Sequence, residues 1–338
     1  MLSPHVTRAP TPLSRLCALG VADAREQLER LIPQGQGWCA TEVENLGHDP
    51  GRWPAALVRP AALAQAWLAE AQDLGRLDVR WSAVIDRLDR VGNQWRVLDA
   101  AGVIVGEAPA VVVTAAYGAL ALLEGRHGLN FGALPLRPVK GQLTFAALEQ
   151  APLAPRPMRD NGVYVPAYED TGLPPQWPAR IWAMGSTYER GQTDTNVMSA
   201  AHERNATSLD AMHPQAAAEL RACADRGALL GWAQVRCASL DRLPLVGAAP
   251  DVPALTALMQ SAGHRRGRVP LSDTPRLPGL FLLTALGSRG LTLAHWCAIA
   301  LAARMAGEAS ILSEEDKDLE RALDPARFAW KLARRQGA

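Results

Sequence analysis

A turn bounded by glycines, Gly287-Ser288-Arg289-Gly290, separates an apolar run over 279–285 from a second one over 291–306. The first run has the length of a strand and the second has helical length and spacing, so the turn is predicted to open a helix. The first N–H groups of a helix have no partner within it and carry the positive end of the helix dipole, which suits an anion. A reduced flavin carries negative charge near N1 and its C2 carbonyl, so this turn could hold its ring. The alternative is a plain strand-to-helix connection in which the glycines serve backbone geometry alone.

A second candidate is Arg236, which lies on a predicted strand over 231–237 just before a polar turn. The planar guanidinium matches a carboxylate through two parallel hydrogen bonds, so Arg236 could anchor an acidic substrate. The alternative is a surface ion pair with a residue such as Asp241, and the residues around Arg236 by themselves favour that ion pair.

Further basic residues fall in three places. Lys140 precedes a predicted strand over 142–145, and its segment could equally be a linker between domains. A cluster at 264–268 and the basic tail would suit RNA phosphates, although such charge runs are usually solvated surface. These residues are His264, Arg265, Arg266 and Arg268, with Arg327, Lys331, Arg334 and Arg335 in the tail.

Composition limits the classes of protein. The chain has 338 residues, 48% of them hydrophobic, which is enough to bury the core of two closely packed domains. Its 35 basic and 34 acidic residues give a net charge of +1, so any nucleic-acid contact must come from a local patch. The five cysteines are widely spaced without a C-x-x-C pair, which predicts neither disulfides nor a metal site and favours the cytoplasm. We expect no signal peptide and no membrane span, because charged residues interrupt the longest apolar stretch.

The elements that must position these residues are read from hydrophobic periodicity. Apolar residues at helical spacing predict helices over 12–31 and 60–74. Turns at Gly92-Asn93 and Ala101-Gly102 predict an antiparallel meander with strands over 78–81, 83–90, 94–99 and 103–107.

The rest of the chain predicts a sheet-rich architecture. The β-branched run 110–115 indicates a strand buried on both faces of a parallel sheet. Short apolar segments between 134 and 242 predict a sheet-based domain, crossed by helical structure over 202–220 that breaks before Pro214. The segments 244–250 and 263–278 are predicted to be irregular.

The order of four segments resembles the D-amino-acid-oxidase superfamily: Gly51-Arg52-Trp53-Pro54, residues 137–142, residues 236–247 and residues 287–290. Within it, other segments are similar to the FAD-dependent domain of the tRNA 5-methylaminomethyl-2-thiouridine biosynthesis proteins. These segments are 185–190 with Asp194, 243–251, 285–290 and 323–328. Together they span nearly the whole chain.

The resemblance implies FAD as cofactor and a tRNA substrate. The implied reaction removes the carboxymethyl group from 5-carboxymethylaminomethyl(-2-thio)uridine at the wobble position and leaves the 5-aminomethyl group. The substrate side chain is an N-substituted glycine, so the implied steps are hydride removal from its methylene carbon to the flavin and hydrolysis of the imine to amine and glyoxylate. A methyltransferase partner for the next step could be supplied by another chain.

The resemblance also implies roles for particular residues. Arg236 would hold the substrate carboxylate. The cofactor would contact Val84, Gly118, Gly287, Ser288, Arg289, Gly290 and Leu291, and the substrate or tRNA would contact Lys140, Gln142, Tyr164, Arg265, Arg266 and Arg268.

One part of the family pattern is missing from residues 1–338. The family's flavin domain opens with a strand, a G-x-G-x-x-G turn and a helix, a unit of roughly 30 or more residues. Residues 35–40 (Gly-Gln-Gly-Trp-Cys-Ala) satisfy a G-x-G-x-x-A pattern, but a predicted helix precedes them and no helix clearly follows, so we reject them as that unit. We expect either a start upstream of Met1 or a remnant, with strand 110–115 at an exposed apolar edge.

The expected fold class is therefore α/β: a D-amino-acid-oxidase-like FAD-binding domain lacking its first βαβ unit, plus an antiparallel-sheet substrate domain. Residues 1–133 are expected to form part of the FAD domain, 134–242 the substrate domain, and 243–338 the return to the FAD domain. Two alternatives remain, namely a small-molecule glycine or amine oxidase of the same superfamily and a non-catalytic remnant.

Overall fold

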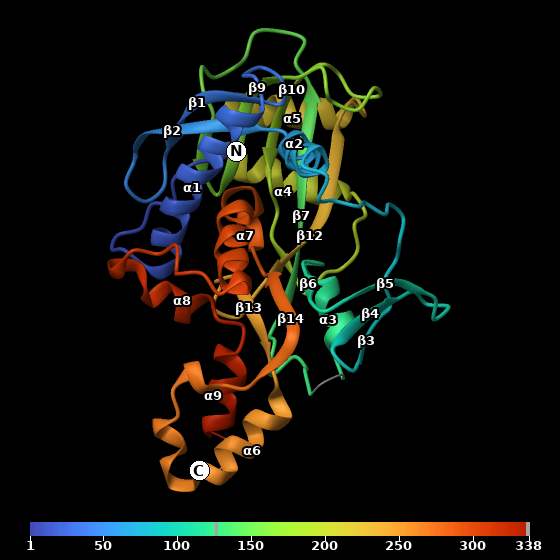
Figure 1. Cartoon of the computed structure of the whole chain (residues 1–338). Helices are drawn as coiled ribbons and strands as arrows, with labels where there is room; N and C mark the ends of the chain where they lie inside the picture. The colour runs from blue at the N-terminus through green and yellow to red at the C-terminus, as the bar shows by residue number, and fades with distance from the viewer. Residues whose placement is uncertain (126–127, 336–338) are drawn as a thin grey trace. The chain divides into compact units, whose positions relative to one another are not determined.

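The computed structural model describes residues 1–125 and 128–335 (Figure 1). Its contacts divide the chain into two compact units. The first consists of Met1–Asp78, Val139–Val235 and Leu291–Leu293, and the second of Val79–Pro138, Arg236–Gly290 and Ala294–Ala338. The prediction of a mixed α/β fold with several antiparallel sheets is confirmed.

The first unit is built on an eight-stranded sheet with the order β11-β7-β10-β9-β8-β1-β2, in which β12 also pairs with β7. Its strands are β1 (Trp38–Asn45), β2 (Gly51–Val58), β7 (Arg137–Ala147), β8 (Met158–Asp160), β9 (Gly162–Glu169), β10 (Arg180–Gly185), β11 (Glu189–Arg190) and β12 (Leu230–Ala238). Helix α1 (Pro12–Leu31) packs with α2 (Pro60–Asp73) near β1 and β2. The hydroxyl of Thr11 accepts a hydrogen bond from the Ser14 amide at 3.1 Å, which fixes the start of α1.

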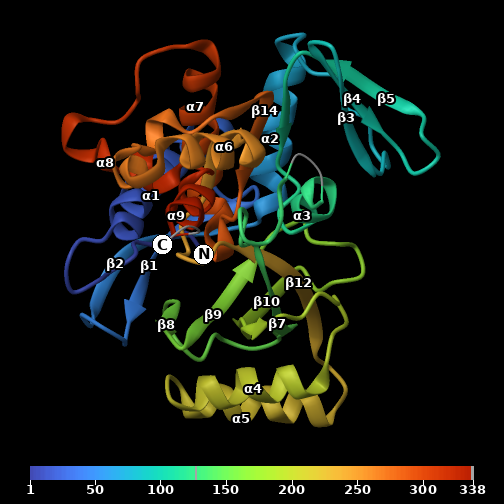
Figure 2. The ribbon, with the colours of Figure 1, turned by 90° about the horizontal axis from the view of Figure 1, so that it is seen from below.

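Two antiparallel helices, α4 (Ser199–Asp210) and α5 (Pro214–Asp225), cover one face of strands β7, β9 and β10, as Figure 2 shows. Thr144, Met184 and Tyr164 stand opposite one another on neighbouring strands, so their side chains share a face. That face is the one under the helices, because these residues pack with Leu209 and Leu220 or bond to α4. The even-numbered residues of β7 therefore point toward α4 and α5.

The second unit is built on a smaller sheet with the order β13-β14-β6, formed by β13 (Leu245–Pro250), β14 (Arg276–Thr284) and β6 (Val111–Val113). A separate meander is formed by β3 (Arg87–Val91), β4 (Gln94–Leu98) and β5 (Ile104–Ala108). Helices α3 (Gly118–Leu123), α6 (Val252–Ala262) and α9 (Arg327–Arg335) supply Leu120, Leu255 and Phe328 to the core of this unit. Figure 1 shows α6 beside α9.

Most predicted elements are present, and several predictions are corrected. Helices 12–31 and 60–74 are confirmed as α1 and α2, and the last three strands of the meander are confirmed within a few residues. No strand covers 78–81, and 244–250, predicted irregular, contains β13. The rejected glycine pattern at 35–40 leads into strand β1 rather than a helix, which confirms the rejection.

The strand predicted over 110–115 is β6, and its predicted burial on both faces is wrong. Among the described residues β6 is the last strand of its sheet, pairing with β14 on one side only. The Val112 side chain is 37% exposed because one face of this edge strand is uncovered. Among the described residues, no helix is both long and apolar enough to cross a membrane.

Candidate functional site

The candidate site lies at one edge of the second unit's sheet. β14 and β6 run parallel, with Leu280, Phe281 and Leu282 opposite Val111, Val112 and Val113. The carboxyl ends of both strands therefore meet at the same edge, which is where ligands bind in open α/β sheets. The hydroxyl of Thr284, the last residue of β14, donates to the carbonyl of Ala116 at 3.0 Å. This bond holds the turn that leads into Gly118 beside the end of β14.

The end of β12 reaches the same edge. Ala238 forms an antiparallel bridge with Leu286, two residues after β14 ends. Cys237 is buried in the core, 3.9 Å from the Thr284 hydroxyl, and burial raises the pKa of its thiol. Because side chains alternate along a strand, Arg236 points to the face opposite Cys237. The structure thus brings Arg236, Gly118 and the turn 287–290 to one edge, although the sequence separates them widely.

The turn 287–290 is a short 3-10 helix, η3 (Gly287–Arg289), which continues into α7 (Gly290–Ala306). Gly287 has φ +58°, a left-handed conformation that favours glycine. A Cβ added at Gly287 or Gly290 would meet no heavy atom within 4 Å among the described residues, so open space adjoins the turn. The Arg289 side chain does not cap α7, within the part of the chain that is described, so no N-cap side chain accepts from the first N–H groups of the helix.

These features fit the ring end of a flavin. Backbone N–H groups at a helix start suit its anionic edge, and the two glycines let a planar group approach the backbone closely. At the other end of such a cofactor, the phosphates of FAD need a glycine-rich strand-turn-helix unit. Within the described residues β6 has no neighbour on its outer side that could form that unit.

The chain belongs to a family of flavoenzymes. The family described as FAD dependent oxidoreductase (DAO) matches residues 14–304, which is most of the chain, and FAD is its cofactor. The chain is 34% identical over 326 residues to the tRNA 5-methylaminomethyl-2-thiouridine biosynthesis bifunctional protein MnmC of Ralstonia nicotianae, covering 96% of this chain and 44% of that protein. The protein of the same name from Verminephrobacter eiseniae is 31% identical over 387 residues, covering 97% of this chain and 56% of that protein. The chain spans about half the length of these relatives.

Solved structures agree on the fold. Iminodiacetate oxidase from Chelativorans has a TM-score of 0.64 and 17% identity, with 93% of this chain and 86% of that chain covered. Glycine oxidase from Geobacillus kaustophilus has a TM-score of 0.61 and 17% identity, with 91% and 82% covered. The predicted D-amino-acid-oxidase-like fold is therefore confirmed.

Three residues predicted to contact substrate or tRNA are buried in the first unit. The Lys140 ammonium is 2.6 Å from the Asp194 carboxylate, and its side chain is 3% exposed. The side-chain amide of Gln142 donates to the Met198 carbonyl at 2.9 Å and accepts from the Met198 N–H at 2.8 Å. Tyr164 lies between the sheet and α5. The polar groups of Lys140 and Gln142 are satisfied within the chain, so the function proposed below does not depend on them.

Val84 lies elsewhere in the second unit. It precedes β3 in an irregular segment, and its side chain is 78% exposed. Its contact with the cofactor stays a prediction.

The two basic segments predicted from the sequence meet in the second unit. A groove of about 580 Å³ lies between η1 (Gly263–Arg268) and α9, lined by His264, Arg266, Gly267, Trp330, Lys331, Arg334 and Arg335. The guanidinium of Arg334 donates to the Gly267 carbonyl at 2.6 Å and lies 4.5 Å from the centre of the Trp330 ring. Arg265 and Arg268 are exposed on η1. Basic side chains around an aromatic ring are typical of surfaces that bind RNA.

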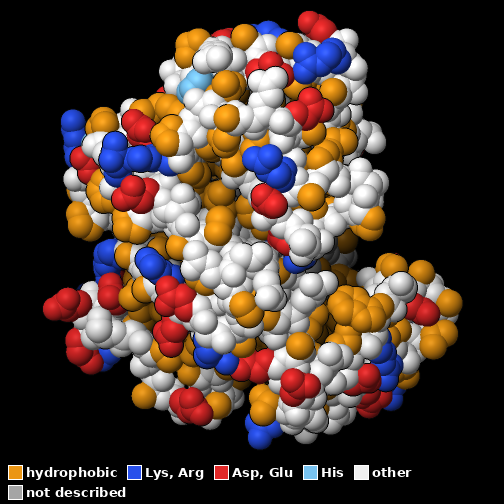
Figure 3. All heavy atoms as spheres, turned by 90° about the horizontal axis from the view of Figure 1, so that it is seen from above, with side chains coloured by type: hydrophobic (Ala, Val, Ile, Leu, Met, Phe, Trp, Pro, Cys, Tyr) orange, Lys and Arg blue, Asp and Glu red, His pale blue; other side chains and the backbone are white. Residues whose placement is uncertain are grey.

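Elsewhere the charges are mixed. On the face drawn in Figure 3, Lys and Arg side chains are interspersed with Asp and Glu. No group of three or more His, Cys, Asp or Glu side chains in the described chain is arranged to hold a metal ion.

One tail residue has a different role from the predicted one. The sequence predicts Arg327, with the basic tail, as a phosphate contact, but its side chain is 3% exposed and bonds twice to Asp241, at 2.8 and 2.9 Å. It is unavailable to RNA because it links α9 to the turn after β12.

Two residues that contribute to these surfaces are not among the predicted site residues. Thr284 had a weak signal, as a polar residue ending an apolar strand. Trp330 gave no signal, because only the fold places its ring beside η1.

Proposed function

We propose that this chain carries out the FAD-dependent removal of the carboxymethyl group from 5-carboxymethylaminomethyl(-2-thio)uridine at the tRNA wobble position, giving the 5-aminomethyl form. The proposal is supported by relatives at 31–34% identity whose name places them in biosynthesis of this modification. The observation that carries it is the meeting of Arg236, the Gly118 turn and the glycine turn 287–290 at one sheet edge.

In the proposed reaction the protein side chains bind and orient the substrate, and no side chain acts as a nucleophile. Bound FAD would accept the hydride, which carries two electrons, from the methylene carbon of the N-substituted glycine, while the nitrogen loses its proton to water. Arg236 would hold the carboxylate of that glycine unit and so orient its methylene carbon. The oxidised substrate is an imine, and water cleaves its C=N bond to give the aminomethyl nucleoside and glyoxylate. The α7 N-terminus would stabilise negative charge at the cofactor edge.

The tRNA substrate is proposed to lie along the groove between η1 and α9. Lys331 and Arg335 line the groove, Arg265 and Arg268 are exposed on η1, and these side chains could contact successive phosphates, while Trp330 lines the groove with an aromatic ring. A cytoplasmic location follows from a tRNA substrate. A methyltransferase supplied by another chain would act on the aminomethyl product.

The test of the reaction uses purified protein with added FAD and tRNA carrying the carboxymethylaminomethyl group. We expect glyoxylate release together with conversion of the nucleoside, followed by mass spectrometry. Arg236→Gln should raise KM strongly while flavin absorbance is retained, because it removes the carboxylate anchor and leaves the glycine turn. The matched control is Arg90→Gln, an exposed arginine on β3 of the same unit, which should react like the parent protein.

Three outcomes would count against the proposal. Unchanged kinetics in Arg236→Gln would remove that residue from the carboxylate role. Efficient oxidation of free N-substituted glycines, with no reaction on tRNA, would favour a small-molecule oxidase. A protein that remains colourless with added FAD would favour a non-catalytic remnant.

The test of the groove is the salt dependence of tRNA binding. The slope of log K against log salt concentration should become shallower by about one for each phosphate contact removed by Arg265→Ala or Arg268→Ala. Arg90→Ala should leave it unchanged. Equal slopes in all three variants would exclude η1 as the tRNA surface.

A further inference from the structure

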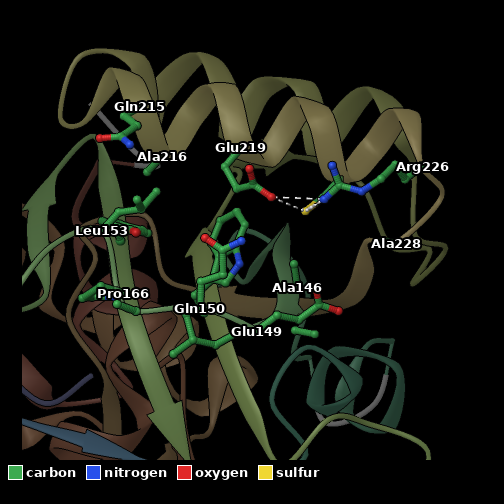
Figure 4. A pocket seen from close by; sticks show the side chains of 16 residues that line it. Ala146, Glu149, Gln150, Leu153, Pro166, Gln215, Ala216, Glu219, Arg226 and Ala228 are labelled. Carbon is green, nitrogen blue, oxygen red and sulfur yellow. Dashed lines mark hydrogen bonds and ion pairs between the residues drawn. The ribbon is translucent and has the colours of Figure 1, made fainter.

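A cavity in the first unit lies between α5 and the sheet. Its volume is about 270 Å³, close to the lower end of the range for small-molecule sites. Figure 4 shows Gln215, Ala216 and Glu219 facing it from α5, and Ala146, Glu149 and Gln150 facing it from the end of β7 and the residues that follow. It contains none of the residues proposed above to hold the flavin or the substrate carboxylate.

The inner wall of the cavity is apolar with a single hydroxyl. Ala146, Trp182 and Ala216 are buried there, and Trp182 packs edge-on against Tyr164 with ring centres 6.2 Å apart. Tyr164 is 1% exposed, and burial raises its pKa to about 12, so the phenol stays neutral. Within residues 1–125 and 128–335, the structure provides no hydrogen-bond partner for this hydroxyl. The hydroxyl oxygen itself is not fully buried, and because Tyr164 lines the cavity, a ligand there could take its hydrogen bond.

The rim of the cavity is charged, with an excess of one carboxylate. Arg226 donates to Glu219 at 3.1 Å and to the sulfur of Cys223 at 3.2 Å, so its charge is already paired (Figure 4). The thiol of Cys223 donates to Glu219 at 3.4 Å, and burial raises its pKa to about 11, which keeps it protonated. Glu149, exposed at the rim, forms no salt bridge among the described residues, although its charge also acts on Arg226. One negative charge therefore remains above an apolar wall.

We propose that this cavity binds a small organic cation, a compact planar or apolar body carrying an amine or amidine group. The body would lie between Ala216 and Trp182, and the cationic group would pair with Glu149 at the rim. The side-chain amides of Gln150 and Gln215 and the Tyr164 hydroxyl would take the remaining hydrogen bonds. A carboxylate ligand would be repelled by the excess negative charge of Glu149.

The experiment uses benzamidine, a planar cation that has no C–H bond next to nitrogen for an amine oxidase to attack. The chain has four tyrosines, so ¹³C-labelled tyrosine gives a simple NMR spectrum in which Tyr164→Phe identifies one signal. Benzamidine should shift the Tyr164 signal saturably, while benzoate should not, and benzamide should bind more weakly. Glu149→Gln should weaken benzamidine binding about two- to fivefold, as expected for a partly exposed ion pair.

Two variants test whether the cavity itself is the site. Gln150→Trp places a bulky ring at the exposed mouth and should abolish the shift without disturbing the core. Ala224→Trp places the same ring on an exposed position of α5 that does not line the cavity, and it should bind like the parent protein. The proposal is overturned if benzoate shifts Tyr164 as strongly as benzamidine, if Gln150→Trp still binds, or if the shift fails to saturate near about 10 mM ligand.

Discussion

Replacing Arg327 should destabilise the second unit far more than replacing any other arginine of α9. Its guanidinium donates to both carboxylate oxygens of Asp241 and to three carbonyls, those of Leu243, Pro244 and Asp324, over distances of 2.8 to 3.1 Å. The Arg327 side chain is 3% exposed and that of Asp241 is 31% exposed. This cluster joins α9 to the turn after β12, the strand that carries Arg236.

The expected loss in the free energy of unfolding follows from the Asp241 carboxylate, which Arg327→Ala leaves without its partner. Removing one partner of a buried ion pair costs about 3–5 kcal/mol, because the other charge stays buried and unpaired. Asp241 keeps some contact with water, so we expect the lower end, about 3 kcal/mol, for Arg327→Ala. Arg327→Lys keeps the positive charge but loses the two parallel hydrogen bonds to the carboxylate, and it should lower the free energy of unfolding by about 1–3 kcal/mol.

The assay is equilibrium unfolding in urea, followed by tryptophan fluorescence and by circular dichroism. Arg335→Ala is the matched control, since that residue is exposed on the same helix and should change the free energy of unfolding by less than about 0.5 kcal/mol. A double-mutant cycle with Asp241→Asn should give a coupling of about 1–3 kcal/mol. The reasoning fails if Arg327→Ala costs less than about 1 kcal/mol, or if lysine replaces Arg327 without loss.

Two further predictions concern stability. Gly279→Ala should cost about 2–4 kcal/mol, since its φ is +73° and the new Cβ would lie 2.2 Å from the Pro109 carbonyl oxygen. Gly102→Ala, at φ +79° with open space, should cost less in the same urea titration, and equal losses would contradict the steric argument. Asp170 should make the free energy of unfolding depend on pH in the acidic range. Burial raises the pKa of its carboxyl group, but hydrogen bonds from Arg59, the Gly172 N–H and Tyr168 outweigh burial, so the pKa is lowered. Because the pKa of Asp170 is lower in the folded protein, its ionised form stabilises the fold. This stabilisation is fully present above the unfolded pKa of about 3.9, and it is lost as pH falls through the folded pKa. Asp170→Asn should therefore lose less stability than the parent between about pH 5 and pH 3, and parallel losses would refute this.

Local signals were sufficient for much of the fold. Helices α1 and α2 could be predicted because apolar spacing, a proline at the first helical position and, for α1, the Thr11 cap agree with one another. The turn 287–290 could be predicted because a strand, a glycine pair and a helix follow in sequence. Strand β13 was missed, since its Gly247 and Pro250 read as turn residues and only pairing with β14 makes the segment a strand.

Tertiary contacts decided the rest of the site. The burial of Lys140 and Gln142 could not be predicted, because the side-chain alternation of β7 is clear but the face that α4 covers is not. The meeting of η1 with α9 joins segments about sixty residues apart, and no local pattern encodes it. Arg327 looked like its basic neighbours, and only the fold separates a buried arginine from exposed ones.

The outer edge of β6 has a consequence for handling the protein. Within the described chain its N–H and C=O groups have no strand to pair with, and Val112 adds an exposed apolar side chain. Such an edge can pair with another molecule, so self-association should rise with concentration. The strand is only three residues long, which limits the length of any intermolecular ladder. Activity and tRNA-binding measurements should therefore be made on dilute protein whose monomeric state is checked by light scattering.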